Sequence, residues 1–403
     1  MPIVPLLIGF AVSLVAALVF VPAVGRAAIR WGWVDAPDGR RKIHRAPIPN
    51  VGGIAILGAT LLGIAVMTLG AYELPNKWAA ALTLPGRRVL LGALLISVVG
   101  LVDDLRDLDF RTKFVAQLAV TALAFSANLR IELLDGVLGT GALGMSASFV
   151  LTTLWMVGMM NAVNLIDGMD GLAAGVVAIA MFGLAAVHAI GGDVGYLVLV
   201  AALTGALVGF LRYNRSPATI FMGDSGSLLL GYVLGAYAMR GSAHADPVLA
   251  LVIPAVVMGL PVLDIMVSML RRRLMGRPMF SPDKDHIHHR LAARMPQKEA
   301  VTTLYWLGAF LALGACAMAA FPAPLAAVTF ALGSGVVYSF LRSVGYLPSP
   351  HRILATFRRR ETMRRAGQLY DARQAREQRQ KRQAEKAGAL PDERFHPVSA
   401  AQR

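Results

Sequence analysis

The segment 161–171, which reads NAVNLIDGMDG, places two asparagines and two aspartates directly after an apolar run. Asn161, Asn164 and Asp167 recur every three residues, so on a helix they share one face. A carboxylate at the centre of a membrane helix costs about 2.5–3.5 kcal/mol even on lenient insertion scales. A helix end capped by Asp170 would explain one carboxylate but not the two asparagines. We therefore expect this face to have a polar partner.

Two adjacent carboxylates, Asp103 and Asp104, end the third apolar run. Neighbouring negative charges repel each other unless a cation compensates them, and the C-terminal end of a helix disfavours them further. Lys113, nine residues beyond Asp104, is a candidate to neutralise the pair or to contact phosphate. A solvated helix end is the alternative, but this position favours a metal or another cationic partner.

Further carboxylates stand near the ends of other apolar runs. Asp224 begins one such run, where it could cap a helix and still bind a metal. Oxygen ligands suit Mg²⁺ or Mn²⁺, and such an ion most often bridges phosphate oxygens. A divalent cation site is predicted from the whole set, which comprises Asp103, Asp104, Asp167, Asp170, Asp224 and Asp264.

Three histidines, His286, His288 and His289, precede Arg290 in the largest polar loop. Histidines suggest zinc, but the adjacent His288 and His289 cannot both face one ion on a regular helix, and no cysteine assists them. A polar, partly cationic wall for a diphosphate or nucleotide is the better explanation. The basic loop that contains His44 leads into two glycines whose N–H groups suit an anion, although a plain cytoplasmic loop is the alternative there.

These residues are connected by segments typical of a membrane protein. Of 403 residues, 56% are hydrophobic, and the mean hydropathy is +0.59. We expect an all-α polytopic fold with a transmembrane domain over 1–341 and a basic tail over 342–403. Cys316 is the lone cysteine, which excludes an intrachain disulfide. Eleven apolar runs could span a bilayer, at about 3–25, 51–71, 88–102, 114–128, 147–166, 171–190, 195–211, 226–240, 247–269, 302–320 and 324–341.

The charge distribution predicts the orientation of these spans. Basic residues concentrate after the first, third, seventh and ninth spans, and the positive-inside rule assigns these connections to the cytoplasm. The N-terminus is then outside and the tail cytoplasmic. Because the net charge of +15 resides in loops and tail, it reports on topology and on contact with membrane lipid, and we expect no nucleic-acid partner.

Together these features predict metal-assisted phosphoryl transfer between a soluble nucleotide compound and a membrane lipid, at the cytoplasmic face. An ion-coupled transporter is a remote alternative, because it would place its carboxylates near the bilayer midplane, usually between inverted repeats. A scaffold whose basic tail recruits partners is another alternative, but it leaves the acidic residues unexplained.

Four motifs in order resemble those of the polyprenyl-phosphate N-acetylhexosamine-1-phosphate transferases: Asp103-Asp104 and the segments 161–171, 221–227 and 286–289. The resemblance covers about residues 1–341. The segment His-Ile-His-His-Arg within 280–290 looks like the WecA branch, which uses UDP-GlcNAc. It is less like the MraY branch, whose loop reads Pro-x-His-His-His and which uses UDP-MurNAc-pentapeptide.

The resemblance implies that undecaprenyl phosphate attacks UDP-GlcNAc at the bacterial inner membrane, giving lipid-diphosphate-GlcNAc and UMP. Another UDP-N-acetylhexosamine (GalNAc, a deoxy-sugar or MurNAc-pentapeptide) is the alternative donor, and a homodimer is compatible with the family. By motif, Asp224 and Asn164 would hold Mg²⁺ (or Mn²⁺), while Asp103 and Asp104 would position the lipid phosphate, with Asp103 the candidate base.

The same resemblance implies that the remaining motif residues contact the substrates. Lys113 would neutralise phosphate charge. The residues that would bind the nucleotide or order the metal site are Asn161, Asp167 and Asp170. Contacts with the diphosphate or sugar would come from His286, His288, His289 and Arg290, with His44.

Overall fold

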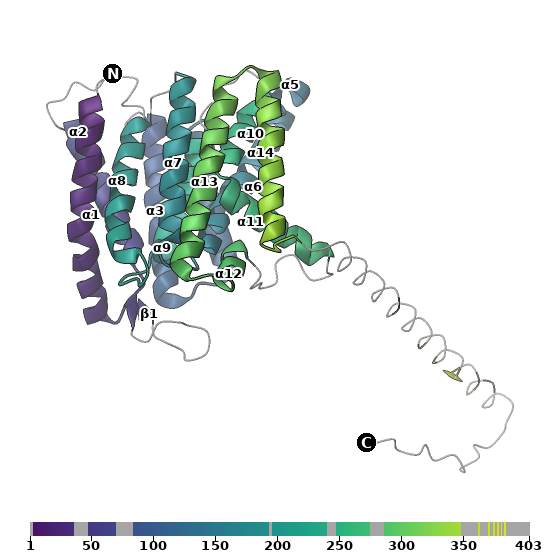
Figure 1. The fold of residues 1–403 in the computed structure, drawn as a ribbon, viewed down its shortest axis with the longest axis horizontal. Coiled ribbons are helices and arrows are strands. Elements are labelled where there is room, and N and C mark those ends of the chain that lie inside the picture. Colours follow the sequence, from purple (N-terminus) through teal and green to yellow (C-terminus); the bar gives the residue numbers. More distant parts are fainter. Residues whose placement is uncertain are drawn as a thin grey trace, which may run out of the picture. The chain divides into compact units, whose positions relative to one another are not determined.

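The computed structural model describes residues 3–35, 47–69, 84–192, 196–239, 247–274 and 286–347, and isolated positions of the tail (Figure 1). Its contacts divide the chain into two units, one of residues 1–268 with 282–346 and one of 269–281 with 347–403. The first unit is a bundle of long helices. Its only strands among the described residues are β1 (Val34–Asp35) and β2 (Ile48–Pro49), an antiparallel pair.

In its described residues, every predicted apolar run falls on a helix, and the ninth run falls on two. The short helices α5 (Asp135–Leu138) and α12 (Ile287–Ala292) lie outside these runs. The long helices are α1 (Ile3–Trp31), α2 (Gly52–Leu69), α3 (Leu84–Arg106), α4 (Phe110–Ser126), α6 (Ala142–Ile166), α7 (Leu172–Ile190), α8 (Leu197–Asn214), α9 (Gly223–Ala238), α10 (Pro247–Val257), α11 (Gly259–Leu274), α13 (Gln297–Ala320) and α14 (Ala323–Ser343).

The chain is an all-α polytopic membrane protein, but the number of spans stays a prediction. Seven helices of the described part are long and apolar enough to cross a membrane, or eight if the pair α10–α11, bent by 94°, is one span. Helices α4 and α9 have only 17 and 16 residues, so at 1.5 Å per residue each is about 24–26 Å long, short of a hydrocarbon core of about 30 Å.

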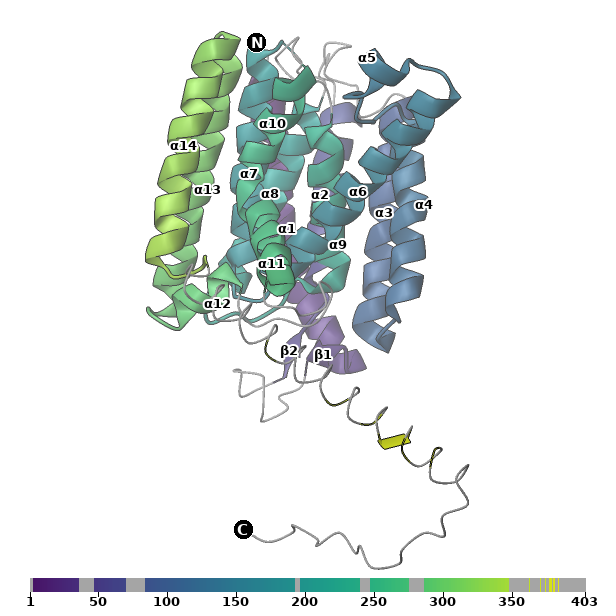
Figure 2. The same ribbon diagram turned by 90° about the vertical axis from the view of Figure 1, so that its right-hand side faces the viewer.

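Helix α9 lies inside the bundle, between α3, α6 and α2 (Figure 2). Every residue of α9 except Asp224 is buried. Glycines permit this close packing: a Cβ on Gly100 of α3 would lie 2.4 Å from the carbonyl oxygen of Asp224, and one on Gly53 of α2 would lie 2.2 Å from the backbone nitrogen of Gly226. The start of α9 is therefore fixed by direct backbone contact with two neighbouring helices.

The start of α2 is tied to the segment that leads into α9. Gly52 N–H donates to the carbonyl of Phe221 over 2.9 Å, Gly53 N–H to that of Met222 over 2.9 Å, and Phe221 N–H to that of Pro49 over 2.8 Å. These bonds bring the N-termini of α2 and α9 together at one end of the bundle. The C-terminal end of α3 meets them there.

Candidate active site

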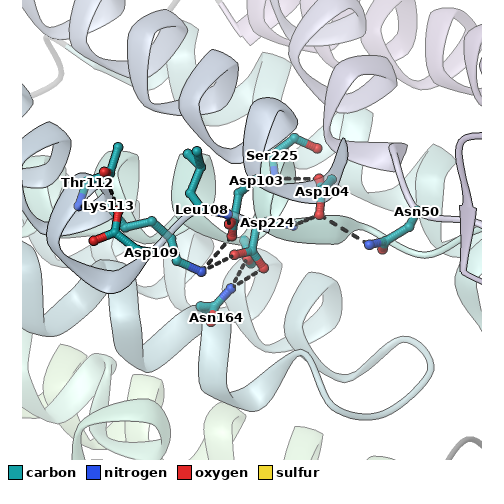
Figure 3. A network of polar contacts seen from close by, with 11 residues as sticks. Asn50, Asp103, Asp104, Leu108, Asp109, Thr112, Lys113, Asn164, Asp224 and Ser225 are labelled. Carbon is teal, nitrogen blue, oxygen red and sulfur yellow. Dashed lines mark hydrogen bonds and ion pairs between the residues drawn. The ribbon is translucent and has the colours of Figure 1, made fainter. Parts of the chain in front are cut away.

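The two carboxylates at the end of α3 point to different partners (Figure 3). Successive residues of a helix are rotated by about 100°, so the side chains of Asp103 and Asp104 leave α3 in different directions. Asp103 accepts hydrogen bonds from Leu108 N–H over 2.7 Å and from Lys113 Nζ over 2.6 Å. Lys113 reaches this position because the chain turns at Asp107, with φ of 49°, and α4 then begins. The lysine that we expected to compensate the acidic pair therefore contacts one member of it.

Asp104 binds the exposed backbone of the α9 N-terminus. Its Oδ1 accepts from Asp224 N–H over 2.8 Å and from Asn50 Nδ2 over 3.2 Å, and its Oδ2 accepts from Ser225 N–H over 3.0 Å. The first N–H groups of a helix lack partners within it, and a negative charge there is favoured by the helix dipole. Asp104 supplies this cap from another helix, so the alternative that Asp224 caps α9 is wrong. The N-cap position is Met222, which makes no side-chain cap bond.

The side chain of Asp224 is consequently available for other contacts. Its Oδ1 accepts from Asn164 Nδ2 over 2.7 Å, and its Oδ2 lies 3.5 Å from Lys113 Nζ. Asn164 Nδ2 also lies 2.9 Å from Ser227 Oγ, one turn further along α9. Lys113 thus stands between Asp103 and Asp224, while α6 orients Asp224 through Asn164 (Figure 3).

The rest of the 161–171 segment divides between this site and its support. Asp167 is the C-cap residue of α6. Burial and the negative charges of Asp224, Asp104 and Asp170 raise the pKa of Asp167. Asp167 therefore lies close to these carboxylates. Asp170 accepts from Ala218 N–H over 3.1 Å in the segment that precedes α9.

Asn161 lies one turn before Asn164 and serves the contact between helices. Its Nδ2 donates to Gln117 Oε1 of α4 over 3.1 Å and to the carbonyl of Val157 over 2.7 Å. In this structure Asn161 therefore joins α6 to α4, and the carboxylates are contacted by Asn164.

Burial and mutual repulsion disfavour the ionised forms of the carboxylates in this site. Burial raises the pKa of Asp104 to about 7, although the N–H groups of Ser225 and Asp224 partly oppose this. Burial and the adjacent Asp103 raise the pKa of Asp224 to about 6. A bound cation would oppose both effects.

The polar cavity offers carboxylate and amide oxygens, the ligand type that the expected Mg²⁺ or Mn²⁺ would take. This cavity of about 540 Å³ is bounded by carboxylates, and no group of three His, Cys, Asp or Glu side chains in the described part of the chain is arranged around one point. Mg²⁺ commonly takes one or two protein carboxylates and completes its shell with water and phosphate oxygens, so Asp224, with Asn164 beside it, could hold such an ion. The cavity is lined by Trp33, Val34, Asp35, Asn50, Val51, Asp103, Asp104, Leu105, Asp107, Leu108, Lys113 and Asp224.

Asp264, which the sequence analysis grouped with the metal-binding carboxylates, belongs to a different cluster. It is buried, and its oxygens contact His286 Nδ1 at 3.1 Å and Ile287 N–H at 3.0 Å. Its oxygens are occupied by the start of α12, so the prediction of one cation site formed by all six carboxylates is wrong for Asp264.

The histidines lie on and beside α12. A Cβ added to Gly168 would lie 3.0 Å from His288 Nε2, so this ring abuts the 161–171 segment. Burial and the neighbouring His289 lower the pKa of His288 to about 4. His288 is therefore neutral at physiological pH, which corrects the expected cationic wall at this position. Arg290 follows on α12, and its Nη1 donates to the carbonyl of Gly345. His44 lies outside the described residues.

Two residues were not anticipated, one in this site and one in the cluster around Asp264. Asn50 precedes the glycines of α2, and its bond to Asp104 depends on the pairing of that segment with the start of α9. Tyr346 follows the last apolar run, and its hydroxyl donates to Asp264 Oδ1 over 2.5 Å. No local pattern marks either contact, because their partners are distant in the sequence.

Comparison with known proteins shows extensive similarity. Residues 87–242 match the family described as glycosyl transferase family 4. A probable undecaprenyl-phosphate N-acetylglucosaminyl 1-phosphate transferase of Bacillus subtilis is 36% identical over 312 residues, 77% of this chain and 84% of the relative. A decaprenyl-phosphate N-acetylglucosaminephosphotransferase of Mycobacterium tuberculosis is 36% identical over 81% of this chain and 86% of the relative. A phospho-N-acetylmuramoyl-pentapeptide-transferase of Caldanaerobacter subterraneus is 30% identical over 76% and 95%.

Proposed function

Since the chain belongs to glycosyl transferase family 4, among the polyprenyl-phosphate N-acetylhexosamine-1-phosphate transferases, we propose that it transfers GlcNAc-1-phosphate from UDP-GlcNAc to undecaprenyl phosphate. The products are UMP and lipid-diphosphate-GlcNAc. The observation that carries this proposal is the position of Lys113 Nζ, 2.6 Å from Asp103 and 3.5 Å from Asp224. Together with a divalent cation, Lys113 would compensate these carboxylates and the phosphate groups that enter the polar cavity beside them.

Two observations support GlcNAc as the donor sugar. Relatives named for GlcNAc transfer are 31–36% identical to this chain, and two named for the MurNAc-pentapeptide are 30–31% identical, so the higher identities belong to the first group. The loop also has the His-Ile-His-His form. The closest rival is the same reaction with UDP-GalNAc, a UDP-deoxy-sugar or UDP-MurNAc-pentapeptide.

The reaction is a displacement at the sugar-linked phosphorus. An oxygen of the lipid phosphate forms the new bond to this phosphorus, and the bond to the UMP oxygen breaks. A phosphate monoester has a second pKa near ~6, so the acceptor is largely dianionic at neutral pH and needs little help from a general base. Catalysis then consists mainly of positioning and charge neutralisation.

Each group of the site has a role in that positioning. Asp224, with Asn164 beside it, would hold Mg²⁺, which when bound neutralises the charge of the diphosphate and of the leaving UMP. Lys113 attracts the lipid phosphate and keeps Asp103 oriented. Asp104 and Asn164 act on Asp224, the first through the backbone of α9 and the second through its carboxylate.

The donor lies between the 161–171 segment and α12 in this proposal. Asp167 faces the carboxylates, and His288 abuts Gly168, so a nucleotide diphosphate placed there would contact both elements. Because His288 is neutral at physiological pH, it acts as a hydrogen-bonding group toward the donor.

We place the site at the cytoplasmic face of the bacterial inner membrane, with the N-terminus outside and the tail inside. The distribution of Arg and Lys supports this orientation. UDP-sugars are made in the cytosol, and the polyprenyl phosphate is a membrane lipid, so such a boundary is where the two substrates meet.

The test is transfer of radiolabel from UDP-GlcNAc to undecaprenyl phosphate by the purified protein, with Mg²⁺, with Mn²⁺ and with EDTA. Parallel reactions use UDP-GalNAc and UDP-MurNAc-pentapeptide. We expect metal-dependent labelling from UDP-GlcNAc alone. Labelling from another donor would change the sugar and keep the mechanism, whereas labelling that persists in EDTA would reject the metal. A folded protein that labels no lipid would reject the proposed reaction.

A further inference from the structure

A buried polar cluster joins three segments that lie far apart in the sequence. Asp264 of α11 is 1% exposed, and Tyr346, beyond the end of α14, is fully buried. The Tyr346 hydroxyl donates to Asp264 Oδ1 over 2.5 Å and lies 3.1 Å from Ser268 Oγ. On the other side, Asp264 accepts from Ile287 N–H over 3.0 Å and from His286 Nδ1 over 3.1 Å. One carboxylate therefore connects α11, the start of α12 and the segment that follows α14.

Tyr346 reaches Asp264 because of the way in which α14 ends. Gly345 adopts φ of +66°, a conformation that glycine tolerates well, and its N–H donates to the carbonyl of Arg342 over 2.9 Å. Tyr346 N–H then donates to the carbonyl of Leu341 over 2.8 Å. This terminal turn directs the tyrosine back into the bundle.

The same turn is bound to the other end of α12. Arg290 Nη1 donates to the carbonyl of Gly345, and Arg294 Nη1 donates to the carbonyl of Ser343 over 3.0 Å. Helix α12 is thus held at its start by Asp264 and toward its end by the α14 terminus. A helix of six residues has too few internal hydrogen bonds to be stable alone, so these external bonds determine where it lies.

The opposite side of α12 faces the candidate active site. His288 is 1% exposed, and its ring is nearly parallel to that of His286, with 7° between the planes and 5.8 Å between the centroids. Its Nε2 is directed at Gly168, and neither ring nitrogen has a hydrogen-bond partner within the described structure. The position of His286, fixed by Asp264, therefore sets the position of His288 beside the 161–171 segment.

We infer that Asp264 and Tyr346 are positioning residues that hold α12, with His288, against the donor side of the active site. This inference rests on the proposed function. Neither residue touches the reacting groups. Their effect is on binding of the nucleotide sugar, since α12 approaches the 161–171 segment, whereas the lipid phosphate is assigned to Asp103 and Lys113 on α3 and α4.

The test is Tyr346→Phe, which removes one hydroxyl and keeps the ring. Tyr338→Phe is the matched control, because Tyr338 lies on α14 itself and is 53% exposed, and its hydroxyl contacts only Arg342 among the bonds described. For each protein we would measure kcat, the KM of each substrate, the melting temperature, and the Kd of UDP-GlcNAc by calorimetry without acceptor.

We expect Tyr346→Phe to raise the KM and Kd of UDP-GlcNAc about fivefold, the effect of one buried hydrogen bond, with the KM of undecaprenyl phosphate unchanged. Asp264→Asn should act in the same direction and more strongly. If Tyr346→Phe does not fold, Arg294→Ala tests the same attachment from the surface and should give a smaller rise.

The outcomes separate this inference from the proposed function. Equal rises in the KM of both substrates, or a lower melting temperature with unchanged donor binding, would show a purely structural role and overturn the positioning role. An active wild type with an unaltered Tyr346→Phe variant would also overturn it. A folded wild type that neither binds UDP-GlcNAc nor labels the lipid would instead reject the proposed function.

Discussion

The carboxylate of Asp104 accepts a hydrogen bond from the backbone N–H of Asp224, over 2.8 Å. The two acidic residues thus cooperate through the main chain, and the side chain of Asp224 stays directed at Asn164 and Lys113. Two carboxylates that look alike in sequence therefore have different tasks. One fixes the start of a helix, and the other faces the cavity.

Asp104→Asn should weaken metal binding and lower stability together. An amide has no negative charge to favour the α9 N-terminus and offers one acceptor oxygen in place of two, which costs about 1 kcal/mol at a helix cap. We expect the Mg²⁺ concentration for half-maximal activity to rise about 10- to 100-fold, as for other residues that support metal ligands. A metal titration and a thermal melt of the same protein check this, and an unchanged titration would contradict it.

Asp224→Asn should reduce kcat/KM more than Asp103→Asn at saturating Mg²⁺. The loss expected for Asp224 is on the order of 100-fold or more, because a preorganised charge is lost at the reacting phosphates. Asp103→Asn should lose less, since the acceptor needs little general-base help. Equal losses, or a phosphosugar trapped on Asp103, would instead favour a covalent route.

Lys113→Met should impair binding of the lipid phosphate. The variant keeps most of the side-chain volume but leaves Asp103 and Asp224 without their shared cation. A charge-assisted hydrogen bond contributes roughly 1.5–3 kcal/mol, so the KM of undecaprenyl phosphate should rise at least about tenfold. Lys113→Arg is the control and should recover part of the activity. Equal activity of Lys113→Met and the wild type would exclude the role.

The metal-free protein should become more stable as the pH falls from 8 to 6. The pKa of Asp104 is raised to about 7 and that of Asp224 to about 6, whereas an unfolded aspartate titrates near ~3.9. Between these values the folded state binds more protons than the unfolded state, so its stability rises as the pH falls. Thermal melts in EDTA check this. Saturating Mg²⁺ should remove or reverse the trend, because it binds the ionised carboxylates.

Gly100→Ala should be strongly destabilising, because its Cβ would lie 2.4 Å from the backbone of α9. Overpacking of this kind typically costs about 1–3 kcal/mol, and here a backbone cannot move aside as a side chain can. Gly158→Ala on α6 is the control, since a Cβ there meets nothing within 4 Å. Similar melting temperatures for the two variants would contradict the close contact between α3 and α9.

The helices and much of the acidic site could be predicted from the sequence, because each rests on a local pattern. Apolar runs mark helices, and the uncompensated pair Asp103-Asp104 called for a cation, which Lys113 supplies. Asp264 was assigned to the wrong cluster because a pattern shows that a carboxylate is near a helix end and not which way it points. The 94° bend within the ninth run was missed, although Pro254 and Gly259 flank the break.

The contact of Tyr346 with Asp264 also bears on how the protein can be shortened. Hydropathy alone suggests that the transmembrane part finishes at about residue 341, and a chain cut there would lose the tyrosine together with the carbonyls that Arg290 and Arg294 use. A cut after residue 346 would keep all of them and remove only the basic tail. Residues 342–346 should therefore be kept in a shortened protein, whereas the basic tail after them can be removed.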